Sequence, residues 1–242
     1  MRANASPLFR KNWIVAGIAG TTIAAGLFWS LVGFAEPAVV IPPAASDEGP
    51  SSGVPETAVL SGGCFWGVQA VFQHVKGVDK VVSGYAGGAK ATASYPLVST
   101  GTTGHAESVE ISFDPRVVSY GKILQIYFSV AHDPTELNRQ GPDEGSQYRS
   151  DIFAASATQK QIAEAYIAQL DKAKVFRSPI VTRVDMLQGF YPAEAYHQDY
   201  ATLNPDNPYI EINDRPKVDH LQALFPALYR AKPRLVGDAA SN

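Results

Sequence analysis

Cys64 is the only cysteine in the 242-residue chain, and it lies in the segment SGGCFWG at residues 61–67. The run TAVL at 57–60 is typical of a short strand, and apolar residues at helical spacing from Val68 to Val75 predict a helix that begins just after Cys64. The unpaired N–H groups at the start of a helix favour a thiolate over a thiol, and the neighbouring glycines let a ligand approach the backbone closely. We therefore interpret Cys64 as a nucleophile, against the alternative of a buried structural cysteine.

Two aromatic residues, Phe65 and Trp66, follow this cysteine directly. Because the apolar stripe of the predicted helix starts only at Val68, the two rings need not both belong to the core. A reactive thiolate beside two rings suits a substrate that carries a small apolar group on an electrophilic centre. The alternative is that both rings are ordinary core residues.

Glu107 is the second candidate, and it emerges from the alternation in ESVEISF at residues 107–113. In a strand, the odd-numbered residues of this segment share one face and are apolar after Glu107, whereas Glu110 lies on the other face. Since the apolar row must face the core, Glu107 is expected at the edge of the core, where burial raises the pKa of a carboxyl group. Such a group stays protonated near neutral pH and can serve as a general acid. The alternative is a glutamate at the end of a strand that bends back to water.

The composition argues against several kinds of function. The formal net charge is −3 and no long basic run occurs, so a nucleic-acid partner is not expected. A single cysteine excludes an intrachain disulfide framework and a multi-cysteine metal site, and no cluster of cysteine and histidine has the spacing of metal ligands. We therefore expect no bound metal and no bound cofactor.

The periodicity of residues 57–230 predicts an α+β fold. Strand-like and helix-like segments follow one another in the order β-α-β-β-α-β, with an extra helix and strand. This is the order of the split βαβ, or ferredoxin-like, core, a two-layer sandwich with helices on one face of a mainly antiparallel sheet. Two long connections rich in glycine and proline, at 84–105 and 132–147, are expected to be functional.

The N-terminal part of the chain has a different character. Basic residues at positions 2, 10 and 11 precede the uncharged run Asn12–Ala35, a pattern typical of an export signal or of a membrane anchor. We therefore expect residues 1–35 to be a signal peptide or anchor. Glu36–Glu56 is rich in proline and serine and predicts a flexible linker. The folded domain is expected at 57–230 with a C-terminal tail at 231–242, exported to a periplasmic or other extracytoplasmic location and either soluble or tethered.

Five motifs of the domain together resemble those of the A-type peptide methionine sulfoxide reductases. They are GCFWG, GYAGG, TGHAESVEISFDP, HDPTELNRQGPDEGSQYRSDIF and AEAYHQDY, and they occur in order within residues 59–229. The resemblance implies thiol-dependent reduction of methionine S-sulfoxide, protein-bound or free, in the repair of oxidised protein. It also implies the α+β sandwich that the periodicity predicts.

The resemblance implies catalytic roles for four residues. Cys64 would attack the sulfoxide sulfur and become a sulfenic acid, while Glu107 protonates the sulfoxide oxygen. Tyr95 and Tyr148 would donate hydrogen bonds to that oxygen. A neutral carboxyl group beside a thiolate would supply both parts of this chemistry.

The same resemblance implies a binding pocket. Phe65 and Trp66 would hold the methyl group on sulfur, and Asp143 would order a water molecule or the substrate backbone. We interpret His197 as a pocket-wall or structural residue and His105 as a loop histidine, because histidine identity alone supports a catalytic role only weakly.

Two alternatives stay open at the level of sequence. A pairing of Cys64 with His197 would make the protein a cysteine–histidine thiol hydrolase. A domain without catalysis would be a tethered module that binds methionine-containing peptides.

The chain departs from many such enzymes because it has no second cysteine near its C-terminus. Those relatives resolve the sulfenic acid as an intramolecular disulfide. Here the reductant must be an external thiol, whether thioredoxin-like, glutaredoxin-like or a small thiol. We expect a monomer whose partners are its sulfoxide substrate and this reductant.

Overall fold

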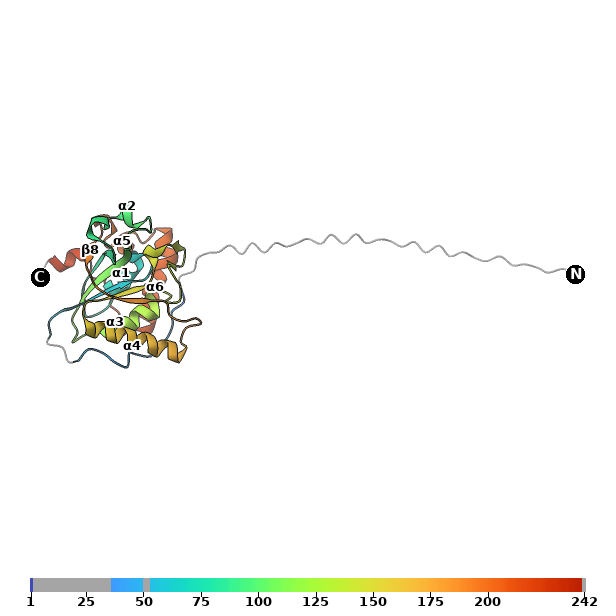
Figure 1. The fold of residues 1–242 in the computed structure, drawn as a ribbon, viewed down its shortest axis with the longest axis horizontal. Helices are drawn as coiled ribbons and strands as arrows, with labels where there is room; N and C mark the ends of the chain where they lie inside the picture. Colours follow the sequence, from blue (N-terminus) through green and yellow to red (C-terminus); the bar gives the residue numbers. More distant parts are fainter. Residues whose placement is uncertain (2–35, 50–52, 241–242) are drawn as a thin grey trace. The chain divides into compact units, whose positions relative to one another are not determined.

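The computed structural model of the chain describes residue 1, residues 36–49 and residues 53–240 (Figure 1). The export signal or anchor expected at 1–35 falls, except for its first residue, outside these ranges. Within them, no helix is long and apolar enough to cross a membrane.

A six-stranded sheet lies at the centre of the described domain. Its strands are β1 (Glu56–Ser61), β2 (Val78–Ala86), β3 (Ala106–Phe113), β6 (Asp151–Ala154), β7 (Arg183–Met186) and β8 (Phe190–Pro192). They are arranged in the order β7-β6-β1-β3-β2-β8. The four inner strands, in the order β6-β1-β3-β2, pair antiparallel. This is the strand order of a ferredoxin-like core. β7 joins β6 in parallel and β8 joins β2 antiparallel at the two edges, so the predicted α+β sandwich is confirmed.

The described domain contains six α-helices. They are α1 (Phe65–Gln73), α2 (Tyr95–Val98), α3 (Tyr120–Ile126), α4 (Ala157–Ala173), α5 (Tyr200–Leu203) and α6 (Arg215–Leu224). α1, α3, α4 and α6 all contribute buried side chains to the same core, and α3 lies beside α4 (Figure 1). Burial of apolar surface at roughly 25 cal/mol per Å² holds the two layers together.

The alternation of β3 is confirmed. Val109, Ile111 and Phe113 are fully buried and belong to the core between sheet and helices, and Glu107 begins their row. Glu110, on the other face, is only partly buried. The strand therefore points the Glu107 side chain toward the helix layer.

The two long connections contain short elements that periodicity does not reveal. The first holds α2, which carries Tyr95. The second holds a hairpin of β4 (Arg139–Gln140) and β5 (Asp143–Glu144), which carries Asp143. Elements of two to four residues, like the three-residue β8, are too short to show an alternating or helical pattern.

Residues 36–49 lie along the domain, which differs from the flexible linker expected there. Ile41 is only 5% exposed and belongs to the core. Its carbonyl oxygen accepts a hydrogen bond of 2.9 Å from Gln125 Nε2, and the Pro42 carbonyl accepts one of 2.6 Å from Tyr166 Oη. Asp47 accepts a hydrogen bond of 2.8 Å from the backbone N–H of Gly121 in the first turn of α3.

These contacts explain why the sequence pattern was misleading. An extended segment docks here through backbone groups, the Asp47 carboxylate and the buried side chain of Ile41, and these contacts produce no periodic apolar signal. The C-terminal tail likewise makes contacts with the domain, since Arg234 N donates to Gln73 O at 3.0 Å and Val236 N donates to the Asp199 carboxylate at 3.1 Å. The packed unit thus extends beyond the expected limits of 57 and 230.

Replacement of Ile41 by alanine tests the docking of the N-terminal segment. We expect a loss of about 2 kcal/mol in the free energy of unfolding, because the change removes a buried side chain and leaves a cavity. The neighbouring Val40 is 79% exposed, so Val40→Ala should change stability by less than about 0.5 kcal/mol. Denaturant unfolding of both variants measures the difference, and equal stability of the two would mean that the segment does not pack as described.

Candidate active site

All eight residues predicted for the site line one cavity of about 140 Å³. They are Cys64, Phe65, Trp66, Tyr95, Glu107, Asp143, Tyr148 and His197, and Tyr209 is a ninth member. They come from the start of α1, from β3, and from short elements in the long loops.

Cys64 is the N-cap residue of α1, and its free thiol is partly buried. Burial is the largest influence on this thiol and raises its pKa well above the ordinary value; the negative charges of Glu107 and Asp214 raise the pKa further. The backbone N–H of Trp66 lowers the pKa, but by less. The expectation of a resting thiolate is therefore wrong, because burial and the surrounding acids outweigh the start of the helix.

Glu107 is 4% exposed and faces the start of α1. Its Oε2 accepts a hydrogen bond of 3.1 Å from the backbone N–H of Phe65. Burial is the main cause that raises the pKa of this carboxyl to about 8, so it is mostly protonated at neutral pH. The buried, protonated carboxyl group agrees with the expectation from the strand pattern, and it lies in the same cavity as the thiol.

Three tyrosines line the cavity. Burial raises the pKa of Tyr95, Tyr148 and Tyr209, so their hydroxyl groups stay protonated and can donate hydrogen bonds. The Tyr209 hydroxyl donates to the Asp143 carboxylate. Tyr209 lies at the start of the helical run that leads into α6, and it was missed because its role depends on a carboxylate 66 positions away.

Glu194 positions Tyr95, and it too was missed. Its Oε1 accepts a hydrogen bond of 2.9 Å from the Tyr95 backbone N–H, and its Oε2 accepts one of 2.9 Å from Tyr85 Oη. Tyr85 is fully buried in β2 opposite Glu107. One carboxylate therefore links the loop that carries Tyr95 to the sheet that carries Glu107.

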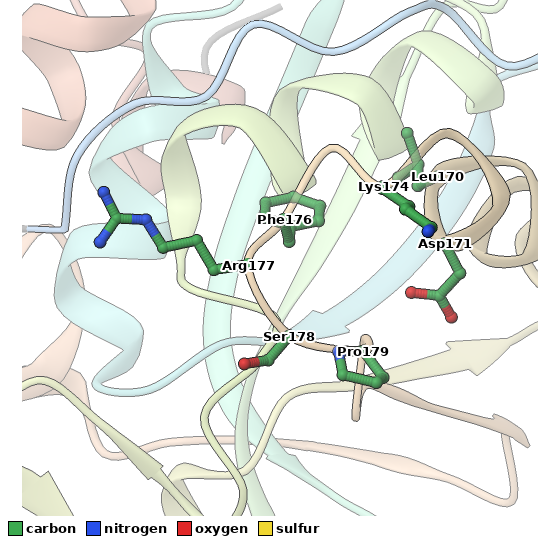
Figure 2. A pocket seen from close by; sticks show the side chains of 7 residues that line it. All are labelled: Leu170, Asp171, Lys174, Phe176, Arg177, Ser178 and Pro179. Atoms are coloured by element: carbon green, nitrogen blue, oxygen red, sulfur yellow. The ribbon is translucent and has the colours of Figure 1, made fainter.

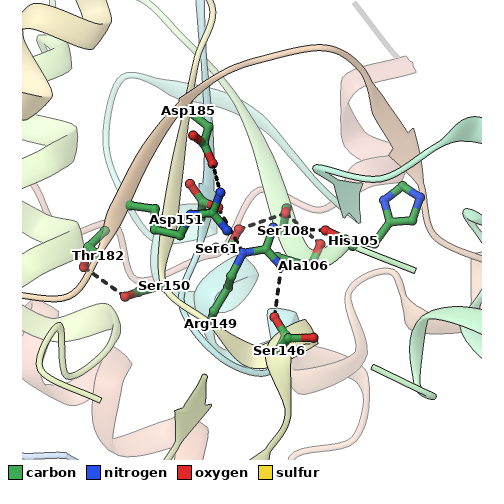
Figure 3. A network of polar contacts seen from close by, with 12 residues as sticks. Ser61, His105, Ala106, Ser108, Ser146, Arg149, Ser150, Asp151, Thr182 and Asp185 are labelled. Atoms are coloured by element: carbon green, nitrogen blue, oxygen red, sulfur yellow. Dashed lines mark hydrogen bonds and ion pairs between the residues drawn. The ribbon is translucent and has the colours of Figure 1, made fainter. Parts of the chain in front are cut away.

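Arg149 positions the segment that carries Tyr148 (Figure 3). Its side chain is buried, and its Nη1 donates to Ser146 O at 3.0 Å while its Nη2 donates to Gly104 O at 3.1 Å. Its Nε donates to the fully buried Asp151 carboxylate of β6 at 3.0 Å. The guanidinium thereby connects the turn before Tyr148 with the loop that leads into β3.

His197 and His105 have different structural roles. His197 Nδ1 accepts a hydrogen bond of 3.2 Å from Trp66 Nε1, and its ring packs against that of Tyr95 with 4.6 Å between centroids. His105 is buried in the loop before β3, where Gly88 N donates to its Nδ1 at 3.2 Å. Within the described residues, neither histidine is hydrogen-bonded to Cys64, so the geometry gives no support to a cysteine–histidine pair.

A second hollow, of about 400 Å³, lies beneath the loop that follows α4 (Figure 2). It is lined by Leu170, Asp171, Lys174, Phe176, Arg177, Ser178 and Pro179. It contains no thiol, and its mixture of acidic and basic side chains does not indicate a particular kind of ligand. In the part of the chain that the structure describes, no three histidine, cysteine, aspartate or glutamate side chains are grouped so that they could hold a metal ion.

Comparisons of the sequence with known proteins agree with this site. A family model described as peptide methionine sulfoxide reductase matches residues 56–227. The chain is 66% identical over 186 residues to peptide methionine sulfoxide reductase MsrA 2 of Mesorhizobium japonicum, which covers 77% of this chain and 95% of that protein. It is 51% identical over 177 residues to MsrA 2 of a Synechocystis species, with 73% and 83% covered.

Solved structures give the same result. The reduced form of Mxr1 from Saccharomyces cerevisiae matches with a TM-score of 0.57 and 30% identity, over 67% of this chain and 92% of that one. Methionine sulfoxide reductase A of Corynebacterium diphtheriae matches with a TM-score of 0.54 and 34% identity, over 72% and 87%.

Replacement of Glu107 by glutamine should stabilise the fold in a pH-dependent manner. The pKa of about 8 in the folded protein lies above the value of about 4.3 in an unfolded chain, so the folded state binds the proton more tightly. With the carboxyl group protonated in both states, below about pH 4, the free energy of unfolding is not reduced. It falls as pH rises from about 4 toward 8, because the unfolded chain releases this proton first. The free energy of unfolding of Glu107→Gln should therefore exceed that of wild type by on the order of 4 kcal/mol at pH 8 and by little at pH 4.

Denaturant unfolding at several pH values measures this difference. Glu110→Gln is the control, since Glu110 is only partly buried and should give a smaller effect. A difference for Glu107→Gln that does not vary with pH would contradict the assignment of a neutral, buried carboxyl group.

Proposed function

Because the chain belongs to the peptide methionine sulfoxide reductase family and so catalyses thiol-dependent reduction of methionine sulfoxide, we propose that Cys64 and Glu107 carry out this reaction. The observation that carries the assignment of these two residues is their shared cavity, in which burial keeps the Glu107 carboxyl protonated. A sulfoxide oxygen leaves readily only after protonation, and a neutral acid at this place supplies the proton.

The proposed step is balanced between the thiol and the sulfoxide. Glu107 gives its proton to the sulfoxide oxygen, and Cys64 attacks as its own proton passes to the Glu107 carboxylate. An S–S bond forms between Cys64 Sγ and the substrate sulfur as the S–O bond breaks, and the oxygen takes up a second proton and leaves as water. A water molecule then attacks Cys64 Sγ and loses a proton, the S–S bond breaks, methionine is released, and Cys64 is left as a sulfenic acid. The substrate sulfur is reduced by two electrons, and the cysteine sulfur is oxidised by two.

The aromatic wall fits the other substituents of the sulfoxide. Phe65 and Trp66 provide an apolar surface for the methyl group, and the Trp66 ring is fixed by stacking on Tyr200 with 3.9 Å between centroids. The hydroxyl groups of Tyr95 and Tyr148 can donate to the sulfoxide oxygen, at about 3 kcal/mol each in the transition state. With the methyl group and oxygen held on separate sides, one epimer fits, and the resemblance in sequence favours the S epimer.

Regeneration of Cys64 needs two external thiols, because the chain has a single cysteine. The first attacks the sulfenic acid and releases water, which leaves a mixed disulfide; the second attacks that disulfide and frees the Cys64 thiol. The donor is a thioredoxin-like or glutaredoxin-like protein or a small thiol. The narrow cavity and the partly buried sulfur favour a small thiol. The substrates are oxidised proteins or free methionine sulfoxide, and the enzyme acts as a monomer.

Stoichiometry without a reductant tests the assignment. The full chain, freed of thiols, should remove one oxygen from about one equivalent of a methionine sulfoxide peptide and then stop, because the sulfenic acid has no partner cysteine. Dimedone should label Cys64 after the peptide is added and not before, as measured by mass spectrometry. Addition of a small thiol should restore turnover.

Variants serve as controls in the same experiment. Cys64→Ser should form no methionine, because a hydroxyl at neutral pH is a far weaker nucleophile than a thiolate. Glu107→Gln should react roughly 10²–10⁴-fold more slowly, whereas Glu110→Gln should match wild type. Sustained turnover in the absence of any reductant would disprove the consumption of Cys64.

We also propose that the protein acts outside the cytoplasm. The support is the composition of residues 2–35, with basic residues ahead of an uncharged apolar run. Cell fractionation of the full chain should find the enzyme in the envelope, and deletion of residues 2–35 should move it to the cytosol. Recovery of both forms in the cytosol would contradict export.

A further inference from the structure

Lys217 of α6 is a buried cation close to the proposed site. Its side chain is only 7% exposed, and its Nζ lies 3.8 Å from Asp214 Oδ1. Burial of an ammonium group is costly unless negative charges surround it. The distance to Asp214 exceeds that of a hydrogen bond, so this one partner does not fully account for the buried charge.

A narrow crevice brings Lys217 next to the reactive thiol. Cys64, Asp143 and Tyr209 line both this crevice and the larger cavity, and Lys217 and Glu36 belong to the crevice alone. The crevice has a volume of about 10 Å³, which is close to the lower limit for one water molecule. The Lys217 ammonium and the Cys64 sulfur therefore face the same small space.

The acidic groups that face Cys64 are Glu107 on β3, Asp143 on β5 and Asp214 at the end of the π-helical turn η5 (Ile210–Asp214). All three raise the pKa of its thiol. The remaining titratable side chains of the two spaces are Tyr95, Tyr148, Tyr209 and His197 around the cavity, and Glu36 and Lys217 in the crevice. Among these described residues Lys217 is the one ammonium group.

Lys217 is held in place by acids on two sides. Burial lowers the pKa of Lys217, but the charges of Glu36 and Asp214, together with a negative charge on Cys64, outweigh it and raise that pKa. Asp214 itself is 1% exposed. Asp214 fits there because residue 67 is glycine: a Cβ at Gly67, in the first turn of α1, would lie 2.2 Å from Asp214 Oδ1. The absence of a side chain at position 67 thus leaves room for the Asp214 carboxylate beside α1.

We propose that Lys217 is a positioning residue for the reaction, and that its charge balances the negative charge that develops on Cys64 as the thiol becomes a thiolate. This role rests on the proposed function, since it concerns the same nucleophile. Without Lys217, a thiolate at this place would meet three acidic groups with only the start of α1 to compensate. With Lys217 it gains a unit positive charge in a confined space, where Coulomb attraction is strong.

Alkylation of Cys64 tests this without any sulfoxide. The full chain contains no other thiol, so the rate of reaction with iodoacetamide, followed by intact mass as a function of pH, reports the thiolate directly. In Lys217→Met the midpoint of this profile should rise by at least about one pH unit, the shift expected from loss of a unit charge within about 10 Å at an effective dielectric constant of about 20. Lys217→Arg keeps the charge and should keep the midpoint within about 0.3 unit of wild type.

Two further variants separate charge from structure. Asp214→Asn removes a negative charge and should lower the midpoint, whereas general loosening of the site would not give opposite signs at Lys217 and Asp214. Lys172→Met, at an exposed position of α4, should leave the midpoint unchanged.

If circular dichroism shows that Lys217→Met does not fold, the double variant Asp214→Asn/Lys217→Met takes its place, because it removes both charges of the buried pair. The midpoint of the double variant should lie above that of Asp214→Asn.

The outcomes are distinct. A higher midpoint in Lys217→Met, or in the double variant relative to Asp214→Asn, supports the proposal, and an unchanged or lower midpoint overturns it. Failure of the proposed function would show instead as a wild-type enzyme that removes no oxygen from a methionine sulfoxide peptide, a result on which the alkylation profile does not depend.

Discussion

The hydrogen bond from the Phe65 backbone N–H to Glu107 Oε2, 3.1 Å long, connects the helix layer to the sheet at the point where the chemistry occurs. It places the carboxyl group at the first turn of α1, one residue beyond Cys64. Because the group is 4% exposed, its charged form would lose hydration that a single backbone donor does not replace. The fold therefore keeps this carboxyl protonated, and a protonated acid is what sulfoxide reduction requires.

Burial acts in the same way on the thiol of the site. The thiol of Cys64 is also kept neutral at rest, so both reacting groups hold their protons until a substrate enters. Tyr95 is held in place by Glu194, 99 positions away. The segment that carries Tyr148 is held by Arg149, which donates to Gly104 O, 45 positions away. The site is thus a set of neutral donors held rigidly around a small apolar space, in which a sulfoxide finds donors for its oxygen and a wall for its methyl group.

Much of this arrangement could be predicted from sequence, because it depends on local pattern. The strict alternation of β3 placed Glu107 in the core row, and the strand, glycine pair and helical stripe around Cys64 placed the thiol at a helix start. The charge state of that thiol could not be predicted in this way. It depends on Asp214 in η5 and Asp143 in β5, which are 150 and 79 positions away from Cys64 in the sequence. Glu194, Tyr209 and Lys217 were missed for the same reason, since each acts through a partner brought near only by the fold. The docking of residues 36–49 was missed because it depends on backbone hydrogen bonds, which leave no apolar pattern in the sequence.

The central claim is that Glu107 is a neutral acid at the pH at which the enzyme works. The most direct measurement is a pH titration of the glutamate side-chain carboxyl carbons by ¹³C NMR, with Glu107→Gln used to identify the signal of this residue. A buried, neutral Glu107 should give a signal that is mostly that of the protonated acid at pH 7 and that titrates near pH 8. A signal that is already that of the carboxylate at pH 7, with a midpoint near the ordinary value of about 4.3, would contradict it.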